Sequence, residues 1–308
     1  MRALDGIHRF VIENSDVRGL LVHLDQTWLA ARGRVDYPPV IEQVLGEAFA
    51  ATVLMSATIK FAGKLTLQVR GPGPIHLLVV QVTEDGATRG LARWEQVPEN
   101  GSLDSLFGSK ARMTISVEAD ALGQPHQGIV EMKGDTFCDA LENYFQTSEQ
   151  LQTAFHLAVS ENTASGLLLQ RLPAAESTAR AGGDAEVQGV DETSDTDGWT
   201  RSLKLAETVT QEELLQLDAE TLLHRLYHQE VVRLFDAKNI CFECACSRQR
   251  TSGVIQGLGV AEAQDILKEQ GRLSITCEFC AEEYVYDAVD IELLFRSTVE
   301  ADHPETRH

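Results

Sequence analysis

The C-terminal part of the sequence holds five of the six cysteines, and four of them stand in two close pairs. Cys244 and Cys246 form a C-x-C pair, and Cys277 and Cys280 form a C-x2-C pair. Zinc binds four thiolates tetrahedrally in closed structural sites, and paired ligands on turns lower the entropic cost of assembling such a site. The pattern therefore predicts a zinc site, because cysteines that serve only as small core residues have no reason to be paired.

Cys241 provides an alternative ligand. It forms a C-x2-C pair with Cys244, which is the spacing of typical zinc ribbons. A ribbon built from Cys241, Cys244, Cys277 and Cys280 thus competes with the first set, and spacing alone does not choose between them. Cys138 stands alone in a helix-like stretch and is interpreted as a core residue.

Such a site could also act as a redox switch. Zinc-bound thiolates remain nucleophilic, and the thiolate is the species that oxidants attack. Their oxidation would remove the ligands and release the metal, together with about 10–16 kcal/mol of binding free energy in small zinc-finger peptides. A small domain that depends on a metal would then unfold. A disulfide between cysteines separated by one residue would be strained, and strained disulfides are easily reduced.

Length and charge limit the class of protein. A chain of 308 residues is long enough for two domains and a connector. Its net charge of -21 opposes binding to nucleic acid, and we find no convincing basic patch in the sequence. The charged N-terminus does not resemble a signal peptide, and no run is long enough to cross a membrane. We expect a cytoplasmic protein, in which clustered cysteines favour metal binding or redox chemistry over structural disulfides.

Residues 1–173 are predicted to form an α+β domain with a largely antiparallel sheet and packed helices. An apolar helix of about five turns is expected after Pro39 and should end near Gly63. Helical spacing around Tyr144, Leu151, Phe155 and Val159 predicts a second helix within residues 135–160. Alternating apolar residues between turn residues predict strands. These strands are expected at 8–14, 17–25, 64–70, 75–83, 88–94, 112–120 and 126–134.

Residues 174–229 are predicted to connect two domains. The segment 174–198 is small, polar and acidic, and it should be a flexible linker because it has too little apolar surface to bury. Thr210 and Glu213 have capping-box spacing at the start of two short amphipathic helices. Those helices need an apolar surface to pack against. The first domain offers it, so we expect the helices to form a detachable cover.

Residues 230–295 are predicted to form a small α+β zinc domain, followed by a tail at 296–308. A strand is expected at 230–236, then two helices, the second of which is stopped by Gly271. A hairpin over 272–287 should complete the domain.

No catalytic motif emerges from the sequence, and we expect no enzyme. His224 and His228 have the spacing of a zincin helix, but Arg225 stands where that motif needs its glutamate base. Thr58 occupies the first glycine position of a would-be phosphate-binding loop before Lys64, and no G-x-S-x-G nucleophile motif is present.

"FECACSRQR", followed by "ITCEFCAEEYVYD", resembles the C-terminal zinc region of the redox-regulated thirty-three-kilodalton heat-shock chaperonin family, the bacterial oxidation-activated holdases. Upstream, "TIKFAGKLTLQVRGPGPIHLLV", "TRGLARW", "YFQTSEQ" and "LLLQRLP" resemble the N-terminal domain of that family. The similarity covers nearly the whole chain in the expected order.

This resemblance implies an ATP-independent chaperone that binds unfolding client proteins under oxidative stress. It implies that Cys244, Cys246, Cys277 and Cys280 bind one zinc ion in the reduced, inactive state. Oxidation would join Cys244 to Cys246 and Cys277 to Cys280, release zinc, unfold the connector and allow active chains to form homodimers. Cys241 departs from the four-cysteine pattern of the family, which leaves a substitute ligand or a third disulfide partner open.

Two other functions compete with the holdase. One is a zinc-ribbon binding module, which salt-sensitive binding to oligonucleotides would favour and the acidic charge opposes. The other is a thiol oxidoreductase that uses Cys277 and Cys280, although the sequence around that pair lacks a thioredoxin-like context.

Overall fold

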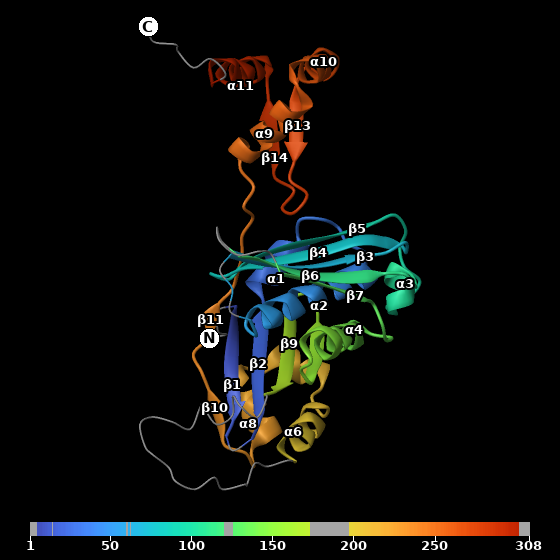
Figure 1. Ribbon diagram of the computed structural model, residues 1–308, viewed down its shortest axis with the longest axis vertical. Helices are drawn as coiled ribbons and strands as arrows, with labels where there is room; N and C mark the ends of the chain where they lie inside the picture. The colour runs from blue at the N-terminus through green and yellow to red at the C-terminus, as the bar shows by residue number, and fades with distance from the viewer. Residues whose placement is uncertain are drawn as a thin grey trace. The chain divides into compact units, whose positions relative to one another are not determined.

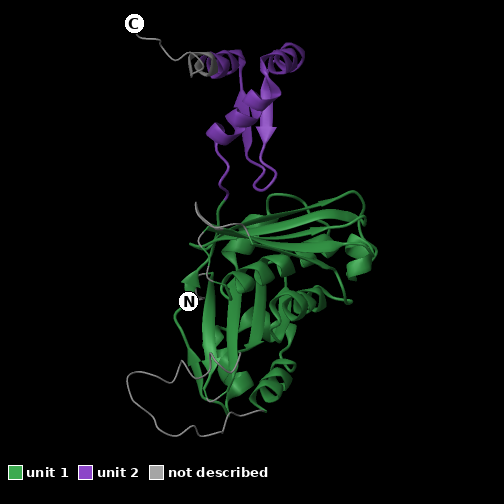
Figure 2. Ribbon diagram, viewed as in Figure 1, with its two compact units in different colours: residues 1–243 green, residues 244–308 purple. Residues whose placement is uncertain are grey.

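The computed structural model describes residues 5–13, 15–59, 61, 63–119, 126–172 and 197–301 (Figure 1). The chain divides into two compact units, Met1–Glu243 and Cys244–His308 (Figure 2). Most of the predicted acidic linker, at 174–196, and residues 302–308 of the predicted tail lie outside the described residues. The predicted α+β class is confirmed, since both units combine helices with largely antiparallel sheets.

The first sheet of the first unit has the strand order β10-β1-β2-β9-β8, with β11 also paired to β1. β1 and β2 form an antiparallel hairpin, and β9 continues the sheet on the other side of β2. The predicted strands at 8–14 and 17–25 are thereby confirmed. The strands are β1 (Gly6–Ile12), β2 (Val17–Leu24), β8 (Thr153–Val159), β9 (Ala164–Arg171), β10 (Val232–Leu234) and β11 (Lys238–Asn239).

The second sheet has the order β12-β5-β4-β3-β6-β7. Its strands pair antiparallel except that β12 runs parallel to β5. The five strands predicted between 64 and 134 are all present. The strands are β3 (Gly63–Arg70), β4 (Ile75–Thr83), β5 (Ala87–Trp94), β6 (Arg112–Ala119), β7 (His126–Glu131) and β12 (Cys241–Phe242).

Helix α2 (Pro39–Ser56) is the centre of the first unit and packs against strands of both sheets. Contact on both sides explains why it is apolar nearly all round rather than on one stripe. It ends at Ser56 and not near Gly63 as predicted. The Ser56 hydroxyl donates to the carbonyl of Val53 and the Thr58 hydroxyl to that of Met55, so side chains satisfy carbonyls of the last turn.

The helix predicted across 135–160 is only partly correct. α4 (Phe137–Tyr144) and a π-helical turn, η1 (Phe145–Glu149), end at Gln150, whose φ of 56° is left-handed. The chain then forms strand β8, which pairs with β9 along its whole length. A short apolar run has no periodicity that separates a strand from a helix, and pairing with β9 decides the outcome here.

Three helices near the end of the first unit form what we call the helical cover, residues 198–227. They are α6 (Gly198–Ala206), α7 (Gln211–Gln216) and α8 (Ala219–Tyr227). The predicted capping box of α7 is confirmed: Thr210 Oγ1 accepts from the Glu213 amide at 3.2 Å, and the Glu213 carboxylate accepts from the Thr210 amide at 2.9 Å. Two further helices of this unit are α1 (Gln26–Arg32) and α3 (Leu103–Phe107).

The described residues of the second unit form a two-stranded sheet and three helices. The predicted hairpin and the two predicted helices are present, and Gly271 ends α10 with a φ of 74°. The elements are α9 (Arg248–Leu258), α10 (Val260–Gln270), β13 (Leu273–Thr276), β14 (Glu283–Tyr286) and α11 (Ala288–Ala301). Residues 230–243, which we grouped with the C-terminal domain, contribute β10, β11 and β12 to the sheets of the first unit.

Candidate metal centre

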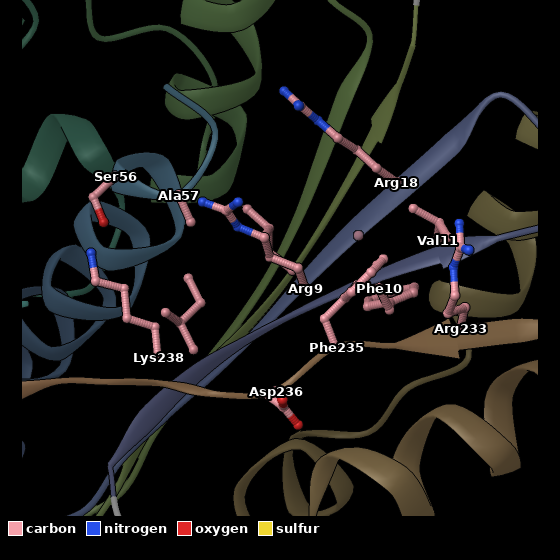
Figure 3. Close-up of a pocket in the computed structure, with 13 residues that line it drawn as sticks. Arg9, Phe10, Val11, Arg18, Ser56, Ala57, Arg233, Phe235, Asp236 and Lys238 are labelled. Atoms are coloured by element: carbon pink, nitrogen blue, oxygen red, sulfur yellow. The ribbon is translucent and has the colours of Figure 1, made fainter. Parts of the chain in front are cut away.

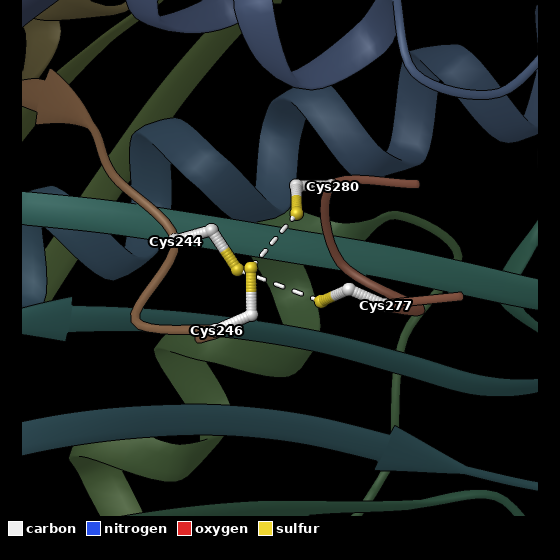
Figure 4. Close-up of side chains that lie close together, drawn as sticks. All are labelled: Cys244, Cys246, Cys277 and Cys280. Carbon is white, nitrogen blue, oxygen red and sulfur yellow. Dashed lines mark hydrogen bonds between the residues drawn. The ribbon is translucent and has the colours of Figure 1, made fainter. Parts of the chain in front are cut away.

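The second unit brings the four predicted cysteines together from two segments (Figure 4). Cys244 and Cys246 lie just before α9, and Cys277 and Cys280 lie in the turn between β13 and β14. Two short stretches therefore each supply one pair of sulfurs.

The distances between the sulfurs fit a single metal ion. All four Sγ atoms lie within 4.8 Å of one another. The Cys244 and Cys277 sulfurs are 3.6 Å apart, and the Cys246 and Cys280 sulfurs are 3.3 Å apart. A tetrahedron with metal–sulfur bonds of about 2.3 Å has edges of about 3.8 Å. Four sulfur ligands in this arrangement are typical of zinc or iron, and not of calcium or magnesium.

Backbone hydrogen bonds hold the turn that carries Cys277 and Cys280. The amide of Cys277 donates to the carbonyl of Glu282 at 2.8 Å, and the amide of Ala281 donates to the carbonyl of Cys277 at 2.8 Å. Ala281 takes a left-handed φ of 56°, which closes the turn. These bonds fix the turn from which both sulfurs of the pair project.

The other pair is held by the start of α9. The Ser247 hydroxyl caps this helix by accepting from the amide of Arg250 at 3.3 Å. The guanidinium of Arg250 donates back to the carbonyl of Ala245 at 2.6 Å, between the two cysteines. The cap and the arginine thus restrain the C-x-C segment.

Burial and hydrogen bonding act in opposite directions on the thiols. Burial raises the pKa of Cys246 and of Cys280, whose side chain is 7% exposed. The Tyr284 hydroxyl donates to Cys246 Sγ at 3.2 Å, which lowers the pKa of Cys246. Four thiolates this close would repel one another, and a divalent cation among them would favour the deprotonated form.

The core of the second unit is small. Its central apolar cluster contains five buried residues, Ile255, Ala263, Leu273, Tyr286 and Ile291. Several large apolar side chains of the same unit are exposed, among them Val254, Leu258, Val289 and Leu293. So small a core provides little stability by itself, and a bound metal would contribute a large share.

The remaining two cysteines belong to the first unit. Cys241 is exposed on β12, where it pairs with Ala87 of β5. Cys138 packs against the core around α2, and burial, followed by the charges of Glu47 and Glu142, raises its pKa to about 12. A thiol with so high a pKa reacts slowly with oxidants at neutral pH.

The helical cover packs on one face of the first sheet, as its amphipathic pattern predicts. The side chains it buries are Ala206, Leu214, Leu222, Leu223, Leu226 and Tyr227. The residues beneath them, which we call the covered face, are Phe10, Ile12, Val17, Leu21, Ala158, Leu167 and Leu169. The rings of Phe10 and Tyr227 lie 6.2 Å apart, and the Tyr227 hydroxyl donates to the carbonyl of Ser202 at 3.3 Å.

A polar contact also fastens the end of the cover. Arg201 Nε lies 2.6 Å from a carboxylate oxygen of Glu230, just beyond α8. No single strong anchor is evident among the described residues of the cover, so its attachment depends chiefly on its buried leucines and tyrosine.

The fold and the site define an α+β protein with a thiol-rich centre in a small C-terminal unit. Comparisons with known proteins agree with this description. The family model "Hsp33 protein" matches residues 5–287. A 33 kDa chaperonin from Nitrosococcus oceani is 42% identical over 308 residues, covering 100% of both chains. One from Chromobacterium violaceum is 40% identical over 305 residues, covering 99% of this chain and 98% of its own.

This chain therefore belongs to the Hsp33 family, whose members are named chaperonins. The fold agrees with that of a 33 kDa chaperonin from Thermotoga maritima, with a TM-score of 0.76, 20% identity, and coverage of 96% of this chain and 99% of that one. Within the described part of the chain, no helix has both the length and the apolar character needed to span a membrane.

Proposed function

We propose that this protein is a redox-regulated, ATP-independent holdase that binds unfolding proteins during oxidative stress. The observation that carries the proposal is the cluster of four thiols within 4.8 Å, in a unit with too small a core to be stable alone. Membership of a chaperone family supplies the general activity, and the thiols supply the means to regulate it. The protein acts by binding and has no catalytic step.

In the reduced state, one zinc ion is bound by Cys244, Cys246, Cys277 and Cys280. Zinc suits an all-thiolate tetrahedral site because it has no redox chemistry of its own, so the thiols alone sense the oxidant. With the metal bound, the C-terminal unit is folded and the helical cover stays on the sheet. This is the inactive state.

Oxidation converts the four thiolates into two disulfides, Cys244 with Cys246 and Cys277 with Cys280. Four electrons leave the sulfurs; two molecules of hydrogen peroxide accept them, take up four protons and become four molecules of water. The zinc ion departs as Zn²⁺ because its ligands no longer carry charge. The C-terminal unit then loses most of its stability.

Chain connectivity couples this loss to the cover. Glu243 is the one residue between β12 and the first ligand, Cys244. Unfolding of the C-terminal unit frees the end of the segment 228–243, which follows α8 directly, and the cover detaches. The covered face, with Phe10, Leu21 and Leu167, then becomes available to apolar segments of client proteins.

We further propose that the oxidised chain forms a homodimer, since a newly exposed apolar face favours association with a second copy. The protein would work in the cytoplasm, where thiols are kept reduced until stress raises the oxidant concentration. Neither nucleic acid nor membrane is needed as a partner.

The test combines three measurements on one sample during a peroxide titration. Zinc release is followed with a chromogenic chelator, aggregation of a heat-denatured client by light scattering, and oligomeric state by size-exclusion chromatography. We expect zinc release and suppression of aggregation to rise together. Equal suppression by the reduced, zinc-loaded protein would remove the redox switch from the proposal.

Cysteine variants identify the ligands. Cys246→Ser should lose tight zinc binding and suppress aggregation without oxidant, whereas Cys138→Ser and Cys241→Ser should behave like the wild type. Weakened zinc binding in Cys241→Ser would instead support the zinc-ribbon set. Mass spectrometry of peptides from the oxidised protein should find the two close pairs, and a Cys244–Cys277 bond would refute the proposed pairing.

A further inference from the structure

A cavity of about 750 Å³ opens in the first unit on the side of the first sheet that faces α2 (Figure 3). It lies where β10, β1 and β2 run side by side and where α2 ends. Ile7, Val11, Leu20 and Phe235 give it apolar walls. Cavities of roughly 300–1,000 Å³ are the size that binds small molecules in proteins.

Strand pairing directs three arginines into this cavity. Val11 pairs with Arg18 on one side and with Arg233 on the other, and Arg9 pairs with Leu20. Residues directly opposite one another in an antiparallel sheet point to the same face, as do residues two apart on one strand. The three guanidinium groups therefore belong to one face of the sheet.

The charge of the lining is the opposite of that of the chain. Lys238 adds a fourth cation to the arginines, and Asp236 is the only acidic residue that the described part of the lining contains. Figure 3 shows the Asp236 carboxylate pointing away from the Arg9 guanidinium. A net positive cavity in a chain with a net charge of -21 selects for an anion.

The cations differ in how fully they are already engaged. Arg18 donates to the Gln170 side chain at 2.8 Å and to the carbonyl of Thr58 at 3.4 Å. Lys238 donates to the carbonyl of Glu84.

Arg233 and Arg9 are less constrained. Arg233 lies over the ring of Phe235, 5.4 Å from its centroid, and 4.0 Å from the carboxylate of Glu13. The Arg9 side chain has no hydrogen bond or ion pair with any described residue, and it extends toward Ala57 at the end of α2. Arg9 thus presents a guanidinium whose donors are available to a ligand.

We propose that this cavity binds a small amphipathic anion, a carboxylate on an aliphatic body of the class of medium-chain fatty acids. The apolar walls accommodate the aliphatic body, and the cations, above all Arg9, bind the carboxylate. Apart from the cations, Ser56 and Asp236 are the only polar side chains among the described residues of the lining. A nucleotide has many polar edges that need partners, and the lining does not provide them.

The proposal is tested by calorimetric titration of the full-length, reduced, zinc-loaded protein with decanoate below its micelle concentration. We expect one site per chain, and an affinity that rises about fourfold for each methylene from octanoate to laurate. Decanol should bind at least tenfold more weakly, and added salt should weaken decanoate binding. Equal binding of decanol, or binding of ADP as tight as that of decanoate, would overturn the assignment.

Arg9→Gln provides the matching variant, and Arg70→Gln, an exposed arginine at the end of β3, is its control. Arg9→Gln should lower the affinity at least tenfold, while Arg70→Gln leaves it unchanged. If Arg9→Gln lowers only the melting temperature and not the affinity, the arginine serves only to offset the partial negative charge at the C-terminal end of α2, and the proposal is wrong. Phe235→Ser should reduce the gain per methylene, and an unchanged gain would place the aliphatic body elsewhere.

Discussion

Leu222 is the residue through which the attachment of the helical cover can be weakened with least other change. Its side chain is 0% exposed and lies in the cluster between α8 and the covered face. Replacing a buried leucine by alanine costs about 2–5 kcal/mol. A cost of about 3 kcal/mol shifts the equilibrium toward the detached cover roughly 140-fold, since each 1.4 kcal/mol is a factor of ten.

Hydrogen exchange on the reduced, zinc-loaded Leu222→Ala protein measures this shift directly. Amides of the helical cover should exchange faster by roughly the same factor, because local opening sets their protection. The sheet strands β3 to β6 should keep their protection. In the same state, the variant should suppress aggregation of a heat-denatured client, whereas the proposed switch has the wild type do so only after oxidation.

Leu106→Ala is the control for a general loss of stability. Leu106 of α3 is 2% exposed and belongs to the core around α2, so a comparable cost is expected without any change in the cover. If Leu222→Ala accelerates exchange across 198–227 but does not suppress aggregation in the reduced state, the cover is not what keeps the chaperone inactive. If both variants suppress aggregation equally in the reduced state, the activity of Leu222→Ala comes from a general loss of stability and not from detachment of the cover.

Three further predictions concern single polar side chains. Burial lowers the pKa of His156, and the opposing effect of Glu207 is smaller. The free energy of unfolding should therefore fall as the pH drops below the pKa of the unfolded state, about 6.5, by at most about 1.4 kcal/mol per pH unit. Urea titrations at pH 7, 6 and 5 should show this loss in the wild type and not in His156→Phe. Tyr284→Phe removes the hydrogen bond to Cys246 and should weaken metal binding roughly tenfold in a chelator competition, with unchanged affinity as the contrary result. Asp5→Ala leaves three amides at the start of α1 without their acceptor, which should lower the free energy of unfolding by about 2 kcal/mol. Calorimetry should then find a melting temperature lower by roughly 4–8 °C, and a change under a degree would contradict this role.

Local signals in the sequence predict the elements that local chemistry determines. Strands β3 to β5 alternate apolar residues between turn residues, and the sheet pairs them as the pattern predicts. Thr210 with Glu213 predicts the start of α7, and Gly271 the end of α10, because each satisfies backbone groups within its own turn. The close spacing of the cysteines likewise predicts a thiol cluster, but it does not choose between Cys241 and Cys246 as the fourth member, and the structure places Cys246 there.

Features that depend on distant parts of the chain leave no such signal. β11 and β12 are two residues each and exist through pairing with β1 and β5. Asp5 caps α1 from twenty residues upstream, outside the range of any capping motif. Strand β8 was mistaken for helix for the same reason. The cationic cavity brings together three separated segments, which is why the sequence shows no basic patch there.

In the proposed mechanism, the unequal cores of the two units would allow one chain to lose part of its structure and still bind clients. The first unit has an extensive core around α2, whose Leu45, Phe49 and Leu54 are fully shielded from solvent and need no metal. The second depends on five buried apolar residues and, in our proposal, on zinc. In that proposal, losing the metal lowers the stability of the second unit while the first keeps its sheets. The stability with which the helical cover is attached lies between those of the two units, because only a few leucines and a tyrosine hold it. Elements that move in a conformational change are drawn from the less stable parts of a structure.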